Sequence, residues 1–164
     1  MRAASTISSI AGLMQARLAE SAAGGTFVLV FEPGEEVITG LTEFTRREGI
    51  RGAHFIGLGA FREVTFAYFV PETRRYEETR IEEQVEALSL VGNLGRLEGE
   101  PRVHAHVVVG RRDGSTSGGH LVRAIVDPTL EVVASLLSIE LRRAPDPRTG
   151  LALIRHREVD DHRK

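Results

Sequence analysis

Residues Arg102-Val103-His104-Ala105-His106-Val107-Val108-Val109 (RVHAHVVV, 102–109) place two histidines in an alternating pattern typical of a β-strand. Successive side chains of a strand point to opposite faces, so His104 and His106 share one face. The other face carries Val103, Ala105, Val107 and Val109. The segment 103–109 is therefore predicted to be a strand that holds two imidazoles side by side, as a divalent metal ion requires of two of its ligands.

A third histidine follows a predicted turn at Arg112-Asp113-Gly114. The segment Ser115-Thr116-Ser117-Gly118-Gly119-His120 is predicted to be a glycine loop that returns His120 to the strand. The chain has no cysteine, so a metal ion would have nitrogen or oxygen ligands. We predict a divalent metal site, zinc first, with one open position; nickel, cobalt or copper suit the same donors. The predicted ligands are His104, His106 and His120.

The rest of the sequence predicts one helix and a series of short strands. Residues 26–31 (TFVLVF) are apolar almost throughout and indicate a first, buried strand. Pro33-Gly34-Glu35-Glu36 is typical of a helix start, and Gly49 of a helix end. The expected fold class is α+β, a largely antiparallel β-sheet with a flanking helix. Further strands are predicted at 54–58, 61–70, 76–82, 85–91, 121–126 and 130–141.

The two ends of the chain are predicted to lie outside a single domain. Residues 1–25 are expected to form a flexible or short helical leader. Residues 26–155 are expected to form the domain, with a short helical turn at 149–155, and residues 156–164 a polar tail. The apolar residues at helical spacing in the leader are Ile10, Leu13, Met14 and Leu18.

Charge argues against nucleic acid as a partner, and hydropathy argues against a membrane-spanning segment. A net charge of −2 is not that of a protein that binds nucleic acid through a broad basic surface. The pairs Arg46-Arg47, Arg111-Arg112 and Arg142-Arg143 are expected to be solvated ends or turns. No apolar run approaches the ~20 residues that span a bilayer, and the start lacks a signal-peptide core. A cytoplasmic location is expected.

Several stretches together resemble the PPC domain, the "plants and prokaryotes conserved" family, in its stand-alone prokaryotic form. The resemblance runs in order along nearly the whole chain after residue 25. The matching stretches are Glu32-Pro33-Gly34-Glu35-Glu36, Ala53-His54-Phe55-Ile56-Gly57-Leu58-Gly59-Ala60-Phe61, Glu86-Ala87-Leu88-Ser89-Leu90-Val91-Gly92-Asn93, His104-Ala105-His106, Gly118-Gly119-His120-Leu121, Thr129-Leu130-Glu131-Val132 and Pro145-Asp146-Pro147-Arg148-Thr149-Gly150-Leu151.

This resemblance implies a compact fold of antiparallel strands with a flanking helix, and assembly as a homotrimer. Prokaryotic members look like metal-binding proteins whose ligands are the H-x-H and G-G-H histidines, here His104, His106 and His120. Plant members pair the domain with an AT-hook that binds the minor groove. This chain has no Arg-Gly-Arg-Pro core of that kind, so DNA binding does not carry over.

The sequence also suggests positions for several other polar residues. Arg102 falls on the histidine face and would either neutralise a carboxylate or phosphate beside the metal or lie in water at the strand end. A small anionic ligand is thus a candidate partner. Glu86 and Glu131 are expected to be strand-edge charges rather than general bases. Asn93 is expected to be a turn residue rather than a ligand. His54 is expected to be packed or satisfied on its strand.

The leading hypothesis is a small metal-binding protein, with no catalytic residue assigned and any reaction unknown. A bound ion with an open position would lower the pKa of its water and make hydrolytic or lyase chemistry feasible. The first alternative is a binding or regulatory module in which the metal is structural. The second is a DNA-associated protein, by analogy with plant relatives.

Overall fold

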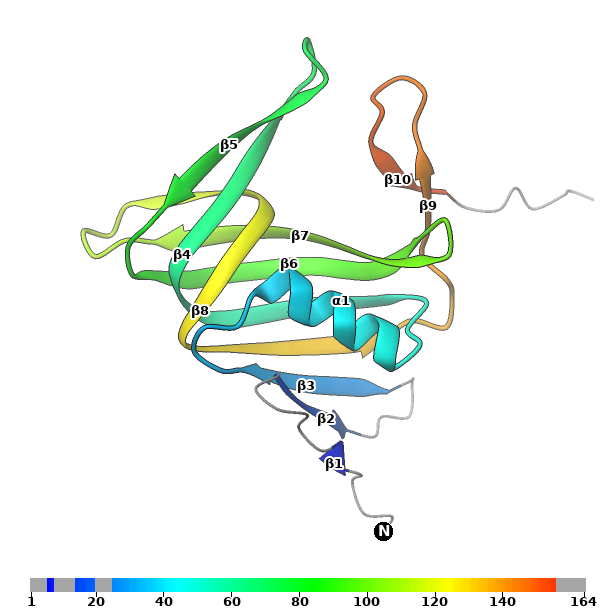
Figure 1. The fold of residues 1–164 in the computed structure, drawn as a ribbon, viewed down its shortest axis with the longest axis horizontal. Helices are drawn as coiled ribbons and strands as arrows, with labels where there is room; N and C mark the ends of the chain where they lie inside the picture. Colours follow the sequence, from blue (N-terminus) through cyan, green and yellow to red (C-terminus); the bar gives the residue numbers. More distant parts are fainter. Residues whose placement is uncertain (1–5, 8–13, 20–24, 156–164) are drawn as a thin grey trace, which may run out of the picture.

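The computed structural model describes residues 6–7, 14–19 and 25–155, and it shows an α+β fold built on one sheet (Figure 1). This part of the chain contains one helix, α1 (Val37–Arg47), which is too short to cross a membrane. The predicted fold class is confirmed. The strands in chain order are β1 (Thr6–Ile7), β2 (Gln15–Ala19), β3 (Thr26–Phe31), β4 (Ala53–Val70), β5 (Arg75–Ile81), β6 (Val85–Leu97), β7 (Glu100–Gly110), β8 (Thr116–Leu136), β9 (Arg142–Pro145) and β10 (Ala152–Ile154).

The long strand β8 organises the sheet. It pairs with β7 over its first residues and with β3 over its last, and β4 runs beside most of its length. Strand β4 also pairs with β6, and β6 pairs with β7. All these pairs are antiparallel, and the short β6–β9 pair is parallel. The pairings from β8 through β4, β6 and β7 back to β8 close on themselves, so β7 is held from both edges.

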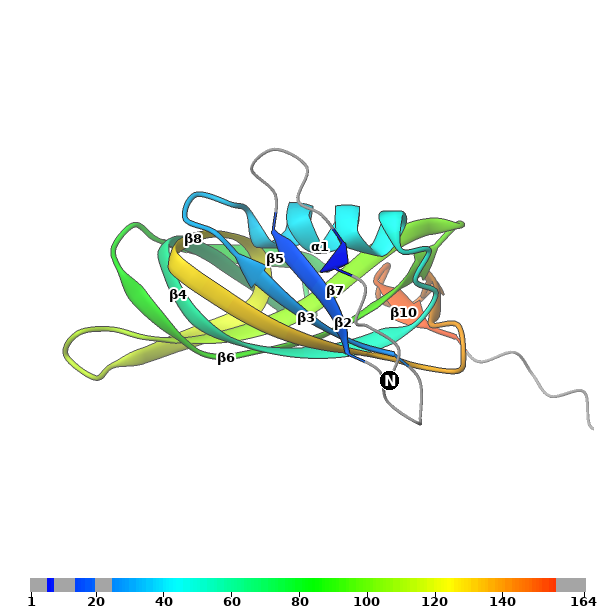
Figure 2. The same cartoon turned by 90° about the horizontal axis from the view of Figure 1, so that it is seen from below.

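Helix α1 covers one face of the sheet (Figure 2). The Glu36 side chain accepts hydrogen bonds from the backbone N–H groups of Ile38 and Thr39, which otherwise lack partners at a helix start. Arg46 and Arg47 occupy the last turn, where positive charge is favourable. The predicted helix is therefore confirmed. Its buried residues are Val37, Leu41, Phe44 and Thr45.

The opposite face of the sheet exposes a row of apolar side chains. Val28, Val133, Ile56 and Val91 are successive cross-strand neighbours on β3, β8, β4 and β6. Their exposed fractions are 39%, 39%, 59% and 46%. Direct cross-strand neighbours share a face of the sheet, and the next neighbour in the row is His106 on β7. We call these four residues the apolar row.

The prediction of a short helix near the start is wrong where the structure describes it. Residues Gln15–Ala19 form β2, which pairs with β3 from Gln15↔Val30 to Ala19↔Thr26. An isolated short helix is marginal in water, whereas the free edge of β3 offers a full set of backbone partners. Part of the predicted leader therefore belongs to the sheet. Ile10 and Leu13 lie outside the described residues.

Further boundaries differ from the prediction. The predicted strands 54–58 and 61–70 are one continuous strand, β4. Strand β6 continues through Gly92, where an added Cβ would lie 2.4 Å from the Phe55 ring, so this glycine makes room for a core side chain rather than a turn. Strand β8 runs without a break from Thr116 to Leu136, so the predicted strands 121–126 and 130–141 are one strand, which ends before the predicted end at 141. The predicted helical turn at 149–155 is instead β10, which pairs with β9 as a hairpin.

The glycines before His120 lie in β8 and not in a loop. A Cβ on Gly118 would lie 2.2 Å from the backbone oxygen of Val107 on β7. A Cβ on Gly119 would lie 2.7 Å from the backbone oxygen of Ala67 on β4. Glycine is required because neighbouring backbones approach too closely for a side chain. The turn itself lies earlier, where the Arg111 N–H donates to the Ser115 carbonyl at 2.8 Å.

We expect Gly118→Ala to lower the free energy of unfolding by about 1–3 kcal/mol, because the added methyl group meets backbone that cannot rotate away. Urea unfolding would measure this loss. Thr116→Ala is the matched control, since Thr116 is exposed on the same strand and should change stability by no more than about 0.5 kcal/mol. Equal stability of the two variants would contradict the close approach of β7 and β8.

Candidate metal centre

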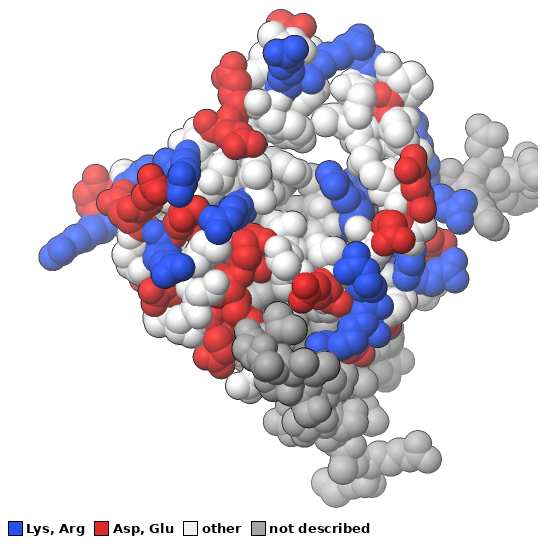
Figure 3. Space-filling model, viewed as in Figure 1, with Lys and Arg blue, Asp and Glu red and all other residues white. Residues whose placement is uncertain are grey.

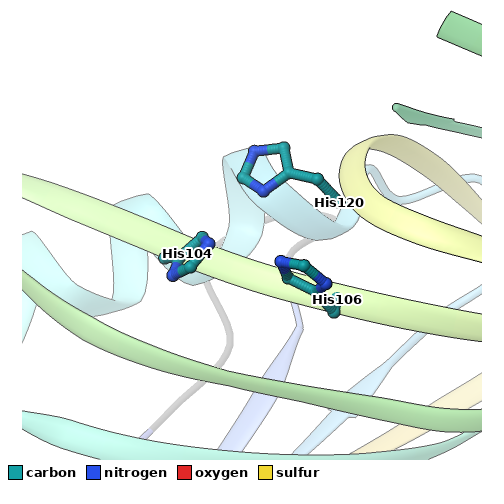
Figure 4. Close-up of side chains that lie close together, drawn as sticks. All are labelled: His104, His106 and His120. Atoms are coloured by element: carbon teal, nitrogen blue, oxygen red, sulfur yellow. The ribbon is translucent and has the colours of Figure 1, made fainter. Parts of the chain in front are cut away.

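The structure brings the three predicted histidines together on two paired strands (Figure 4). His104 and His106 lie on β7, and His120 lies on β8. His106 and His120 are direct cross-strand partners in the β7–β8 ladder. His104 shares their face because it lies two residues from His106. One antiparallel register thus produces the cluster.

The spacing of the three rings suits a shared ion. The ring centroids are 5.3 Å apart for His104 and His106, 5.1 Å for His104 and His120, and 5.5 Å for His106 and His120. One nitrogen from each ring lies within 4.8 Å of the others. A tetrahedral ion with metal–nitrogen bonds of about 2.0–2.1 Å would hold them about 3.4 Å apart.

The surroundings keep two of these imidazoles neutral. Burial lowers the pKa of His104 to about 4, and the positive charge of Arg143 and the neighbouring rings act in the same direction. Burial, followed by the charge of His106, also lowers the pKa of His120. A metal ion binds only the neutral ring, so these two side chains are in the ligand form at neutral pH without first losing a proton.

One ring nitrogen of His120 is buried. Its Nδ1 has no hydrogen-bond partner among the described residues. Its ring stacks on Tyr76 of β5, with centroids 5.1 Å apart and planes at 29°. Buried polar atoms without a partner are uncommon and costly, and each calls for an explanation. The donor set, the neutral rings and this free nitrogen together fit a divalent ion.

The histidines line a cavity of about 250 Å³. Its walls come from β5, β7 and β8, and from the β9–β10 hairpin. Arg102 also lines it, two residues from His104 on β7, so strand alternation puts the two side chains on the same face. The wall further includes apolar residues from the hairpin, namely Leu151, Ala152 and Leu153.

Sequence reasoning missed Arg143, which lines the same cavity. Arg143 was expected to be solvated, but its residue is only 6% exposed. Its guanidinium donates to the Asn93 Oδ1 at 2.6 Å and to the Ala152 carbonyl at 2.8 Å. Burial lowers its pKa, and Arg102 acts in the same direction. The available signal was the strand position of Arg142-Arg143, since successive side chains of a strand point to opposite faces and the two arginines cannot share one environment.

The other residues considered from the sequence lie outside the cavity. His54 is exposed on β4 rather than packed, and Glu86 and Glu131 are exposed on β6 and β8. None of the three is part of the cavity wall. Asn93 lies within β6 and not in a turn, and its side chain holds Arg143. His156 and His162 fall outside the described residues.

Solved structures with this fold come from bacteria and archaea. A candidate DNA-binding protein of Bacteroides thetaiotaomicron is 28% identical, with a TM-score of 0.79 over 85% of this chain and 96% of that one. A metal-containing protein of Archaeoglobus fulgidus is 34% identical, with a TM-score of 0.76 over 84% and 97%. A plant- and prokaryote-conserved (PPC) protein of Pyrococcus horikoshii is 32% identical, with a TM-score of 0.75 over 90% and 98%.

Sequence comparison adds a larger relative and a family. The bifunctional protein GlmU of a Synechococcus species is 29% identical over 121 residues, and this chain spans 18% of the length of that protein. The Plants and Prokaryotes Conserved (PCC) domain matches residues 18–138. The chain therefore belongs to the Plants and Prokaryotes Conserved domain family, the family that its histidine and glycine motifs resemble.

Proposed function

We propose that this protein binds one divalent metal ion, zinc first, through His104, His106 and His120. The observation that carries the proposal is that one nitrogen from each ring lies within 4.8 Å of the other two. A relative 34% identical, from Archaeoglobus fulgidus, is described as metal-containing, which supports it. Three imidazoles and no thiolate suit zinc, and they also accept nickel, cobalt or copper.

The position of the cluster favours a functional ion over a structural one. The ligands lie on β7 and β8, which a backbone ladder from His106↔His120 to Gly110↔Thr116 already joins. An ion is therefore not required to hold these strands together. The cavity lies directly beside the rings. An ion held by three protein ligands has room for a water or substrate oxygen and supplies Lewis-acid or hydrolytic chemistry.

We expect His106→Ala to weaken zinc binding by more than about 100-fold, because one of three ligands is lost. His54→Ala is the matched control: His54 is an exposed histidine on β4, outside the cavity. Elemental analysis and calorimetric titration of both variants would measure the effect. One ion per chain in the wild type and the control, and none in His106→Ala, would support the proposal.

Equal metal content in His106→Ala and His54→Ala would refute this ligand set. The melting temperature of the same samples separates the two roles of the ion. A functional ion predicts that the chelated wild-type protein stays folded, because the β7–β8 ladder persists. Unfolding on chelation would favour the binding or regulatory module with a structural metal.

We also propose that the chain assembles with copies of itself, as a homotrimer. The number three comes from the family resemblance alone. Self-association is supported by the apolar row, whose members are 39–59% exposed on the face opposite α1. An exposed stripe of this kind on a sheet face is typical of a surface that another protein covers. All three histidines come from one chain, so assembly is not needed to bring the proposed ligands together.

Ile56→Glu should therefore disrupt assembly, because it buries a charge at the centre of the apolar row. Light scattering coupled to size exclusion would give the mass, with three times 18.0 kDa expected for the wild type. Ile139→Glu is the control, since Ile139 is 56% exposed but lies outside the row. A monomeric wild type, or a trimeric Ile56→Glu variant, would contradict the proposal. Zinc content should be the same in all three proteins.

DNA association is the second candidate, because the Bacteroides thetaiotaomicron relative is described as a candidate DNA-binding protein. The charge distribution does not favour it. Acidic and basic side chains are interspersed on the α1 face of the molecule (Figure 3). Two arginines of the sheet, Arg80 and Arg123, are both paired with Glu63. Paired arginines of this kind do not form a surface that follows phosphates.

We expect no saturable binding of duplex DNA even at low ionic strength, where phosphate contacts are strongest. Fluorescence anisotropy of a labelled duplex would measure it. A saturable curve whose affinity falls as salt is added would overturn this expectation and favour the DNA-associated candidate.

A further inference from the structure

Arg143 is a buried cation for which the described chain provides no anion. Its residue is 6% exposed, and none of the ion pairs among the described residues includes it. Its two hydrogen bonds go to neutral oxygens, those of Asn93 and Ala152. Its Nε is buried and has no hydrogen-bond partner among the described residues. A guanidinium has five N–H donors, so only part of its capacity is used.

Both charged side chains in the described wall of the cavity around Arg143 are positive. The charged side chains in its wall are Arg102 and Arg143, and the described wall contains no Asp or Glu. The two arginines act on each other and on the rings of His104 and His120 through their charges. A buried charge without a counterion is costly, and in proteins such a group is normally paired or binds a ligand. The Arg143 guanidinium, which has no carboxylate partner among the described residues, therefore lies beside the histidine cluster.

The backbone places the guanidinium next to the proposed metal ligands. Asn93 on β6, which accepts its hydrogen bond, is the direct cross-strand partner of His104 on β7. Cross-strand partners share a face, so Arg143 lies over the same face of the sheet as the imidazoles. A ligand of a few atoms would reach both groups inside a cavity of about 250 Å³.

We propose that this cavity binds a small organic carboxylate, with the carboxylate on the Arg143 guanidinium and a neighbouring oxygen toward the metal ion. This proposal deepens the proposed function, and rests on it for the second contact. Arg143 is the anchoring residue, because a planar guanidinium pairs with a carboxylate through two parallel hydrogen bonds. Arg102 is exposed and adds a second positive charge to the cavity wall.

The wall favours a carboxylate over inorganic phosphate. A planar carboxylate pairs with one guanidinium through two parallel hydrogen bonds, and Arg143 is the one buried arginine of the described wall. The apolar part of the wall suits a carbon skeleton, which phosphate lacks. Its apolar residues are Val103, Leu151, Ala152 and Leu153.

The first test is calorimetric titration of the zinc-loaded full chain with pyruvate. Pyruvate carries a keto oxygen on the carbon atom next to its carboxylate. We expect Arg143→Lys to weaken pyruvate binding at least about tenfold, because the charge remains but the two-point contact is lost. Arg142→Lys is the matched control, since the Arg142 side chain is 57% exposed and lies near Glu140. Pyruvamide, which lacks the charge, should bind more weakly than pyruvate.

A second measurement needs no substitution and covers the case in which Arg143→Lys fails to fold. The Nε–H signal of Arg143, followed by NMR in the wild-type protein, should shift on addition of pyruvate and not of pyruvamide. Three results would overturn the proposal: an Arg143 signal that pyruvate does not move, equal pyruvate affinity in folded Arg143→Lys and wild type, or tighter binding of inorganic phosphate than of pyruvate.

Zinc content measured in the same samples distinguishes failure of the carboxylate site from failure of the metal site. Full zinc content with an Arg143 signal that pyruvate does not move would overturn the carboxylate site and leave the metal site intact. Pyruvate binding that depends on Arg143 in a protein that takes up neither zinc nor nickel, cobalt or copper would overturn the metal site and leave the Arg143 contact standing.

Discussion

The close approach of β7 and β8 is the constraint on which the candidate site depends. Gly118 lets the backbone of β8 pass against the Val107 carbonyl at a distance that no side chain permits. That approach sets the register in which His106 faces His120. A shift by one residue would turn His120 to the other face of the sheet and separate it from the other two rings. The metal site is therefore a consequence of strand pairing.

The β9–β10 hairpin gives the histidine cluster its second characteristic, a partly buried and positive environment. The hairpin carries Arg143 and the apolar residues Leu151–Leu153 over the rings. Burial and positive charge together keep His104 in the neutral form that binds metal. The same positive charge favours an anion in the cavity. One structural element thus supports both proposed contacts, the imidazoles with the ion and the guanidinium with a carboxylate.

Much of the fold could be predicted because it follows from local pattern. The apolar run 26–31, the acidic start of α1 and the alternation of 103–109 each formed the predicted element. The failures came where tertiary pairing overrides local preference. Gln15–Ala19 joined the edge of β3, and the segment around Gly92 continued as a strand because Phe55 packs against it. Helical spacing and glycine content do not report such long-range contacts.

By itself, the sequence determined that His104 and His106 share a face and that the chain has no thiolate ligand, because both depend on residue identity and near neighbours. Only the tertiary structure decided that His120 lies opposite His106 and that Arg143 is buried beside them. The hydrogen bond from Arg143 to Asn93 joins residues 50 positions apart. Contacts at that separation depend on strand order and register, which are properties of the assembled sheet.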